Sequence, residues 1–171
     1  FRADFGFLTR ADTRRVTLNV HPQIWGRPGG WFDRIAFQVV GTRITDHDGN
    51  QTDIEGRIGF GYNGPLQSVL QGFIISTKIL YQGVEIERTF NSGYLEMKPM
   101  AGLWYWLYWE AGDAIDYANA RAASSVLLNP SLEVARGRHL NVNFKHIYEN
   151  LTLEGERTYL ANVLQARTIY N

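Results

Sequence analysis

Polar and apolar residues alternate through most of this chain, and this two-residue period restricts its fold more than any other feature. Leu140, Val142 and Phe144 are apolar, whereas Asn141 and the other residues between them are polar. Successive side chains of a strand point to opposite faces, so the pattern predicts a strand with one apolar and one polar face. A helix would place these polar residues inside its apolar stripe. We therefore expect an all-β protein.

Segments rich in Gly and Pro separate the alternating runs, and they suit hairpin turns. The chain is thus expected to form an antiparallel up-and-down meander of about nine long strands. These cover residues 14–26, 31–45, 52–62, 67–81, 89–98, 103–111, 125–135, 139–151 and 158–170. Both faces of the segment 67–81 are apolar, which predicts either a β-bulge or packing against something inside the fold.

Composition narrows the class of protein. With 171 residues, the chain is long enough for one ordinary domain. It has no Cys, which excludes disulfides, thiolate zinc sites and a Cys nucleophile. Its 17 basic and 17 acidic residues cancel, so it lacks the basic footprint of a nucleic-acid-binding protein, and we expect no such partner. The apolar run Ala101–Trp109 is far shorter than the roughly 20 residues of a membrane helix, although membrane β-strands need only about 9–11.

Three features favour a transmembrane outer-membrane β-barrel. The expected strands exceed the usual length of about 5–6 residues. Tight turns alternate with longer polar links, around Gln82–Gly93 and Gly112–Ala123, as in barrels with short periplasmic turns and longer outer loops. Aromatic residues also gather at both ends of the strands, as in the girdles at membrane interfaces. One girdle would contain Trp25, Trp31, Phe32, Tyr62, Trp104, Tyr105 and Trp106, and the other Tyr81, Phe90, Tyr117 and Tyr148.

A soluble lipocalin-like β-barrel that binds a small ligand is the alternative. The same alternation can separate a protein core from solvent instead of lipid from a lumen.

Several segments resemble the barrel domain of a bacterial outer-membrane family without an assigned activity. Phe1-Arg-Ala-Asp-Phe-Gly-Phe-Leu-Thr-Arg-Ala-Asp-Thr-Arg-Arg15 is similar to the start of that domain, and Gly112-Asp-Ala-Ile-Asp-Tyr-Ala-Asn119 to an outer loop. Residues 128–144 resemble a strand, a tight turn and the next strand, and residues 161–170 resemble the segment that follows. In that family the barrel typically follows an N-terminal carbohydrate-binding-like domain.

This resemblance implies a place in the bacterial outer membrane, with the lipid bilayer as partner. The expected role is a pore or a membrane anchor for the carbohydrate-binding-like module, through which carbohydrate would be a partner. The sequence contains no such module, and nine strands is an odd number, whereas bacterial single-chain barrels have even numbers. We therefore interpret residues 1–171 as one domain that is a fragment of a larger barrel.

The candidate site follows from the same alternation. If the face of Leu140 contacts lipid, the opposite face lines the lumen. The residues expected there are Glu55, Arg57, Glu133, Asn141, Asn143, Lys145 and Arg167. Charges of both signs on that face would form either a structural network or the border of a water-filled passage. On the outer loop after residue 111, Asp113, Asp116 and Tyr117 are candidates for contact with sugar, by analogy with the neighbouring domain of the family.

We expect no catalytic residue, metal or cofactor. The loop Asp46–Asn50 contains oxygen ligands, but a calcium loop needs a bidentate Glu at its twelfth position, where this chain has Arg57. A plain Asp-Gly hairpin explains this loop. The four His residues lack metal-binding spacing, and no nucleophile elbow is present. The chain is therefore not expected to be an enzyme.

Overall fold

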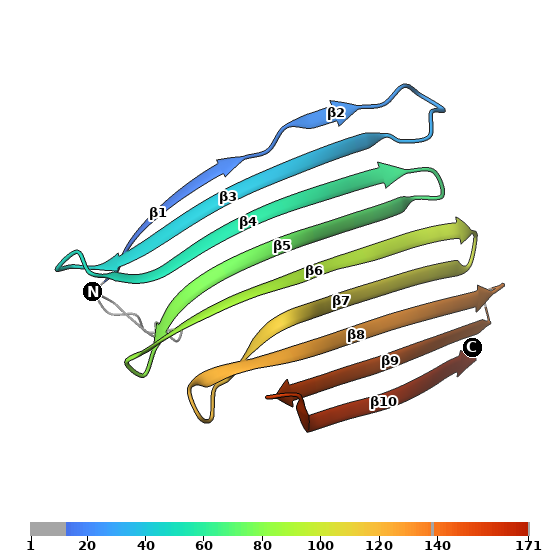
Figure 1. Ribbon diagram of the computed structural model, residues 1–171. Helices are drawn as coiled ribbons and strands as arrows, with labels where there is room; N and C mark the ends of the chain where they lie inside the picture. The colour runs from blue at the N-terminus through green and yellow to red at the C-terminus, as the bar shows by residue number, and fades with distance from the viewer. Residues whose placement is uncertain (1–12, 138, 171) are drawn as a thin grey trace, which may run out of the picture.

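The computed structural model describes residues 13–137 and 139–170, which form one antiparallel sheet (Figure 1). Phe1–Asp12, which belongs to the family resemblance, lies outside the described residues, as do Arg138 of an expected turn and Asn171. Within the described ranges the chain contains no helix, and hence none long and apolar enough to cross a membrane. The prediction of an all-β fold is confirmed.

Ten strands follow one another along the chain. They are β1 (Thr13–Val20), β2 (Gln23–Trp25), β3 (Arg34–Asp46), β4 (Gln51–Gly64), β5 (Ser68–Tyr81), β6 (Val84–Met100), β7 (Leu103–Asp116), β8 (Arg121–Arg136), β9 (Leu140–Leu153) and β10 (Glu156–Tyr170). From β3 onward each strand pairs with the next, which confirms the up-and-down meander.

The first expected strand is divided in two. β1 and β2 both pair with β3 and are separated by His21 and Pro22. Pro has no N–H to donate to the ladder, so it interrupts the strand at this point. The ten strands therefore occupy nine positions across the sheet.

The prediction of two long polar links, around Gln82–Gly93 and Gly112–Ala123, is wrong. The chain turns at residues 82–83 and 117–120, and the rest of each segment extends β6, β7 or β8. Gln82 and Gly83 have φ values of 50° and 80°, which fit a two-residue hairpin turn whose twist matches that of the strands. Pairing continues beyond the turn because Val84 and Ile86 maintain the alternation.

The sheet has two ends, which we name after turn glycines. The Gly102 end contains the connections at residues 26–33, 65–67, 101–102 and 137–139, and the Gly83 end contains those at 47–50, 82–83, 117–120 and 154–155. The connection 26–33 has eight residues and the others have two to four, so the longest connection lies at the end where only tight turns were expected. The expected alternation in connection length is therefore absent.

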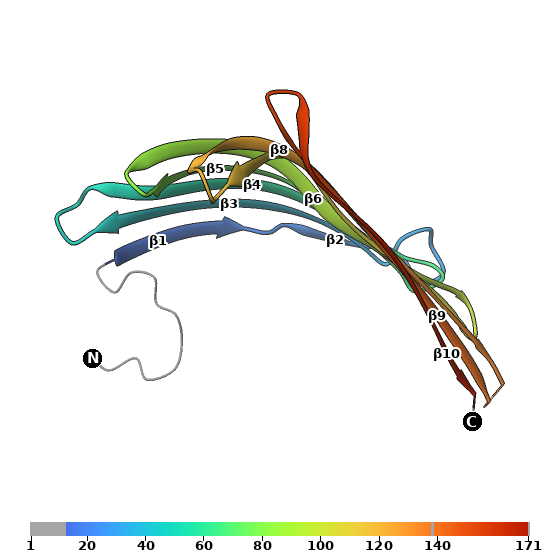
Figure 2. The same cartoon turned by 90° about the horizontal axis from the view of Figure 1, so that it is seen from below.

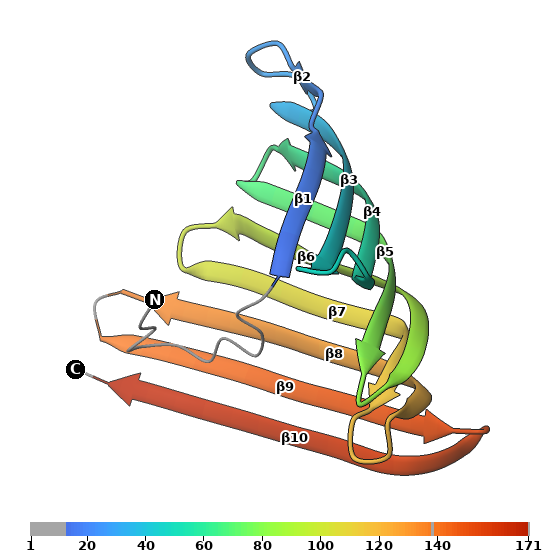
Figure 3. The same cartoon turned by 90° about the vertical axis from the view of Figure 1, so that its left-hand side faces the viewer.

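The sheet is a single curved layer (Figures 2 and 3). Directly paired residues of neighbouring strands lie on the same face, so the register assigns every paired residue to one face. Most buried residues, including Thr42, Ile75, Thr77 and Phe90, lie on one of these faces. We call it the concave face, because side chains converge and shelter one another on that side of a curved sheet.

The opposite, convex face carries most of the exposed large hydrophobic side chains. Val16 on β1 is 72% exposed, Ile58 on β4 is 64% exposed and Leu164 on β10 is 75% exposed. The alternation seen in the sequence thus separates a sheltered face that contains most of the charged candidates from an exposed apolar face.

The two apolar sides of β5 are explained by packing. No β-bulge interrupts the register of β5 with β4 or β6. On the concave face, Phe73 and Ile75 of β5 are paired with residues of β6, and Ile75 lies beside Phe90. The Arg57 guanidinium lies over the Phe73 ring at 5.6 Å, and the Arg88 guanidinium over the Phe90 ring at 4.5 Å. These contacts place an apolar cluster inside the curved sheet.

The aromatic residues expected to form two girdles are divided between the two faces of the sheet. Tyr62, Tyr105 and Tyr148 lie on the convex face, where a lipid-facing ring would be. The register places the side chains of Trp25, Tyr81, Phe90, Trp104 and Trp106 on the concave face instead. Proximity to a turn does not determine the face on which an aromatic residue lies.

Candidate functional site

All seven residues expected to line a lumen lie on the concave face. Glu55 and Arg57 belong to β4, Glu133 to β8, Asn141, Asn143 and Lys145 to β9, and Arg167 to β10. The register brings Glu133, Asn143 and Arg167 side by side on three successive strands. The structure therefore unites the candidates of β8 to β10, whereas those of β4 lie several strands away.

Four of the five candidates on β8 to β10, all except Lys145, line a hollow of about 420 Å³. The Asn141 side chain donates a hydrogen bond to Glu133 Oε1 at 2.7 Å. Gln165, which the sequence analysis missed, lines the same hollow with Asn143 and Arg167. It lies two residues before Arg167 on β10 and therefore on the same face, so the two-residue period was the signal that could have identified it.

The β4 pair forms a local ion pair. Arg57 Nη2 and Glu55 Oε1 are 3.0 Å apart, and both side chains are only partly exposed. Arg57 also covers the Phe73 ring. This part of the concave face fits the structural network, one of the two alternatives that the sequence left open.

The three outer-loop candidates do not form a common site. Asp113 and Asp116 belong to β7 and lie on opposite faces of the sheet, and Tyr117 begins the turn that follows. Asp113 Oδ2 accepts a hydrogen bond from the backbone N–H of Thr89 at 2.8 Å. The Tyr117 ring packs edge-on against Tyr81, with 5.3 Å between centroids. Both contacts stabilise the strand ends.

Asp116 closes the β7–β8 hairpin. Its Oδ2 accepts hydrogen bonds from Asn119 Nδ2 at 2.7 Å and from Arg121 Nε at 3.0 Å. These hydrogen bonds lower the pKa of the Asp116 carboxyl group below its usual range. The carboxylate is therefore engaged within its own turn.

A stripe of aromatic and acidic residues along β7 was not anticipated. Trp104, Trp106, Tyr108 and Glu110 occupy successive concave positions, and we call these four residues the β7 stripe. The Trp106 and Tyr108 rings are 6.4 Å apart with 14° between their planes, and Tyr108 donates a hydrogen bond to Glu110 at 3.0 Å. The apolar run 103–109 hides this stripe in the sequence, because both of its faces carry aromatic or aliphatic residues.

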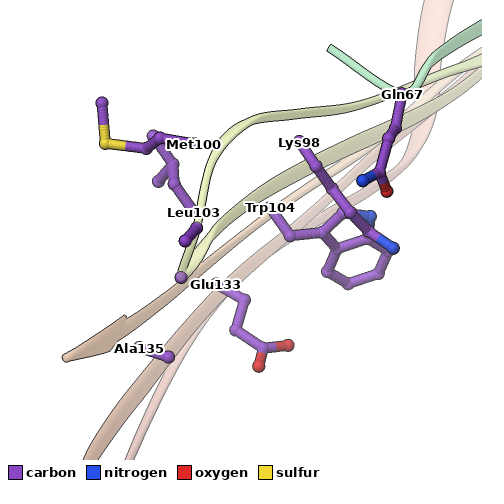
Figure 4. A pocket seen from close by; sticks show the side chains of 9 residues that line it. Gln67, Lys98, Met100, Leu103, Trp104, Glu133 and Ala135 are labelled. Atoms are coloured by element: carbon purple, nitrogen blue, oxygen red, sulfur yellow. The ribbon is translucent and has the colours of Figure 1, made fainter. Parts of the chain in front are cut away.

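At the Gly102 end the β7 stripe borders a second hollow, of about 440 Å³ (Figure 4). Trp104 and Glu133 line it together with Gln67 and Lys98. Trp104 Nε1 donates a hydrogen bond to Glu96 Oε1 at 2.9 Å, which fixes the indole ring against β6. Glu133 lines both hollows, so they are neighbours on the concave face.

The loop considered for calcium is an ordinary hairpin. Both oxygens of the Asp46 carboxylate accept hydrogen bonds from Asn50, from its backbone N–H at 2.8 Å and from its side chain at 2.9 Å. Gly49 has a φ of 91°, a backbone conformation that glycine adopts much more readily than other residues, so the turn itself accounts for a glycine at this position. The Asn50 side chain also lowers the pKa of Asp46. No group of three or more His, Asp or Glu residues within the described part of the chain is arranged to hold a metal ion.

Comparisons of the chain with protein-family models, curated proteins and solved structures found no match. The family resemblance therefore stays a prediction, and the functional argument depends on the geometry of the sheet.

Proposed function

We propose that this sheet is part of the wall of a transmembrane β-barrel in the bacterial outer membrane. Its convex face contacts lipid, and its concave face borders a water-filled passage in which no chemical step takes place. The observation that carries this proposal is the set of exposed large apolar side chains on the convex face of β1 to β5 and of β8 to β10. Asn91 of β6 and the hydrogen-bonded pair of His146 and Asn162 on β9 and β10 interrupt this apolar band.

The height of this band suits a bilayer. On β8 the convex residues from Val126 to Val134 are all apolar. Eight steps of about 3.3 Å, inclined by about 40°, span roughly 20 Å along the membrane normal. Side chains at both ends extend this distance toward the roughly 25 Å apolar band of outer-membrane barrels.

The convex face becomes polar beyond the band, toward the Gly83 end. Ser124 of β8 and Thr152 of β9 are paired there. On β5, Lys78 Nζ lies 2.6 Å from Glu85 Oε1 and 3.0 Å from Glu87 Oε1 of β6. Such a boundary is expected where strands extend out of the membrane into water. A face that packs against an apolar protein surface would not need this change from apolar to polar residues.

The soluble alternative fits the exposure pattern less well. Side chains such as Ile58 and Leu164 are well over half exposed on the convex face. The largest apolar patch of a typical soluble monomer covers only about 300–600 Å². A soluble barrel with an apolar core would place these side chains inside and the charged residues outside.

Edge pairing sets a condition on the proposed barrel. Among the described strands, β1, β2 and β10 form the edges of the sheet. Unpaired backbone groups in hydrocarbon cost several kcal/mol each, so both edges must pair with further strands. β1 and β10 run in the same direction, because they occupy the first and ninth positions of an antiparallel sheet. An all-antiparallel closure therefore requires an odd number of additional strands.

Membrane insertion is tested by extraction and gel migration. We expect the protein to remain in the membrane fraction until detergent is added, and to migrate differently on a denaturing gel before and after heating. A protein that is soluble and monomeric without detergent would refute the membrane assignment.

A passage is distinguished from an anchor by planar-bilayer recording. We expect conductance steps, and a shift in ion selectivity toward cations for Lys145→Glu on the concave face. Arg136→Glu on the convex face is the matched control, because the register places Arg136 outside the proposed passage. The absence of conductance steps would exclude the passage and leave the anchor.

A further inference from the structure

We propose that the two hollows at the Gly102 end of the concave face bind a neutral oligosaccharide, one sugar ring in each. This inference specifies the ligand class of the proposed passage and therefore rests on the proposed function. Both hollows, of about 440 and 420 Å³, are within the roughly 300–1,000 Å³ of small-molecule sites.

The first hollow supplies a flat ring beside polar groups. Its lining contains the Trp104 indole, the Glu133 carboxylate, the Gln67 carboxamide and the Lys98 ammonium group (Figure 4). In Figure 4, the Met100 side chain points away from this group. A pyranose has apolar C–H groups on its faces and hydroxyls around its edge. It can therefore pack on an aromatic ring while its edge forms hydrogen bonds.

The position of the Trp104 ring is set before any ligand arrives. Its Nε1 donates a hydrogen bond to Glu96 Oε1 at 2.9 Å, and Glu133 is its direct partner on β8. The indole N–H is thus already satisfied, which leaves the ring surface for stacking. A ring that is held in advance loses little conformational freedom on binding.

The second hollow is suited to hydroxyl groups. It shares Glu133 with the first and is also lined by Asn141, Asn143, Gln165 and Arg167. A carboxamide donates and accepts hydrogen bonds, as a sugar hydroxyl does. Asn141 already donates to Glu133 at 2.7 Å, which orients both side chains.

The charges favour a neutral ligand over an ion. Lys98 and Glu133 provide opposite charges in the first hollow, and Glu133 and Arg167 do so in the second. Neither hollow therefore has a single sign of charge with which to select a cation or an anion. Beyond Trp104, the β7 stripe provides further aromatic rings, Trp106 and Tyr108, along which a sugar chain could continue.

The test is calorimetric titration of the detergent-solubilised protein with maltohexaose and, separately, cellohexaose. We expect saturable binding of at least one of them, and no binding of sorbitol, which has hydroxyls but no ring face. Trp104→Ala should weaken binding about tenfold, whereas Trp104→Phe, which keeps an aromatic ring, should stay within about threefold. Trp109→Phe on the convex face is the matched control and should change nothing.

Heat-dependent gel migration of each sample shows whether the variant is folded. If Trp104→Ala does not fold, Trp104→Phe is compared with Glu133→Ala instead. We then expect a loss of oligosaccharide binding for Glu133→Ala only. Absence of saturable binding to the folded protein, equal affinity of the folded Trp104→Ala variant, or equal binding of sorbitol would overturn the proposal. Sugar binding without conductance would instead refute the passage and keep the sugar site.

Discussion

Two adjacent leucines of β8 provide the sharpest test of which face meets lipid. Leu127 lies on the concave face, directly between Glu110 of β7 and Glu149 of β9. Leu128 lies on the convex face, between apolar and aromatic neighbours, and is 40% exposed. Replacing each with Arg introduces the same side chain at neighbouring positions with opposite surroundings.

The expected magnitudes follow from the position in the band. Leu128 is two residues from Pro130, the centre of the band on β8, which corresponds to about 5 Å from the midplane at a 40° tilt. Arg costs about 2–4 kcal/mol at the midplane of a membrane barrel and about 0–1 kcal/mol near its interfaces. We therefore expect Leu128→Arg to cost about 2 kcal/mol, or roughly thirtyfold in the folding equilibrium. In Leu127→Arg the new guanidinium lies beside the carboxylates of Glu110 and Glu149, so the free energy of unfolding should change by no more than about 1 kcal/mol.

The assay is guanidinium unfolding of each variant from lipid vesicles, followed by Trp fluorescence, with Leu128→Ala to separate lost packing from added charge. If the concave face were the core of a soluble protein, the order would be reversed. Leu127→Arg would then cost about 3 kcal/mol or more, and Leu128→Arg almost nothing. Equal costs, or that reversed order, would refute the lipid-facing assignment.

Two further predictions concern the hairpin at the Gly83 end and a close contact on the convex face. Because the pKa of Asp116 is lowered from 3.8 by its hydrogen bonds, its contribution to stability is complete above that value and is lost as the pH falls through the lowered pKa. The protection factors of the turn 117–120 against hydrogen exchange, taken relative to the intrinsic exchange rate at each pH, should therefore fall in acid, and Asp116→Asn should remove this change. Gly93→Ala should cost about 1–3 kcal/mol in the same unfolding assay, because the new methyl group would meet the backbone oxygen of Gln71 and the Trp109 ring. Gly72, which is paired with Gly93, has open space at this position, so Gly72→Ala should be nearly neutral.

The strand pattern was predictable because it is local. Alternation in residues 139–151 and 52–62 is sufficient to assign strands, and β9 and β4 have nearly these bounds. The start of β6 was hidden, since Glu85 and Glu87 make it resemble a polar loop. Its cross-strand pairing with β5 and the ion pairs to Lys78 keep it in the sheet. Lys78 lies only seven and nine residues from these two glutamates, across a two-residue turn. The alternation along a single strand does not show such contacts between two strands.

The candidate site was predictable only in part. The two-residue period alone was sufficient to place Glu55, Arg57 and Lys145 on one face. It did not reveal that the β4 pair closes on itself or that Glu133 borders two hollows. The β7 stripe escaped notice for the opposite reason, because both faces of that strand carry large rings and the period gives no contrast.

The sequence by itself determined the two faces of each strand, since the backbone of a strand directs successive side chains to opposite sides whatever its neighbours are. It could not determine which face is sheltered, which residues of different strands meet, or where the turns fall within polar segments. Those were decided by the tertiary structure, because register and curvature depend on hydrogen bonds between whole strands. It is this pairing that places Trp104 beside Glu133 and surrounds Glu133 with the amides of β9 and β10.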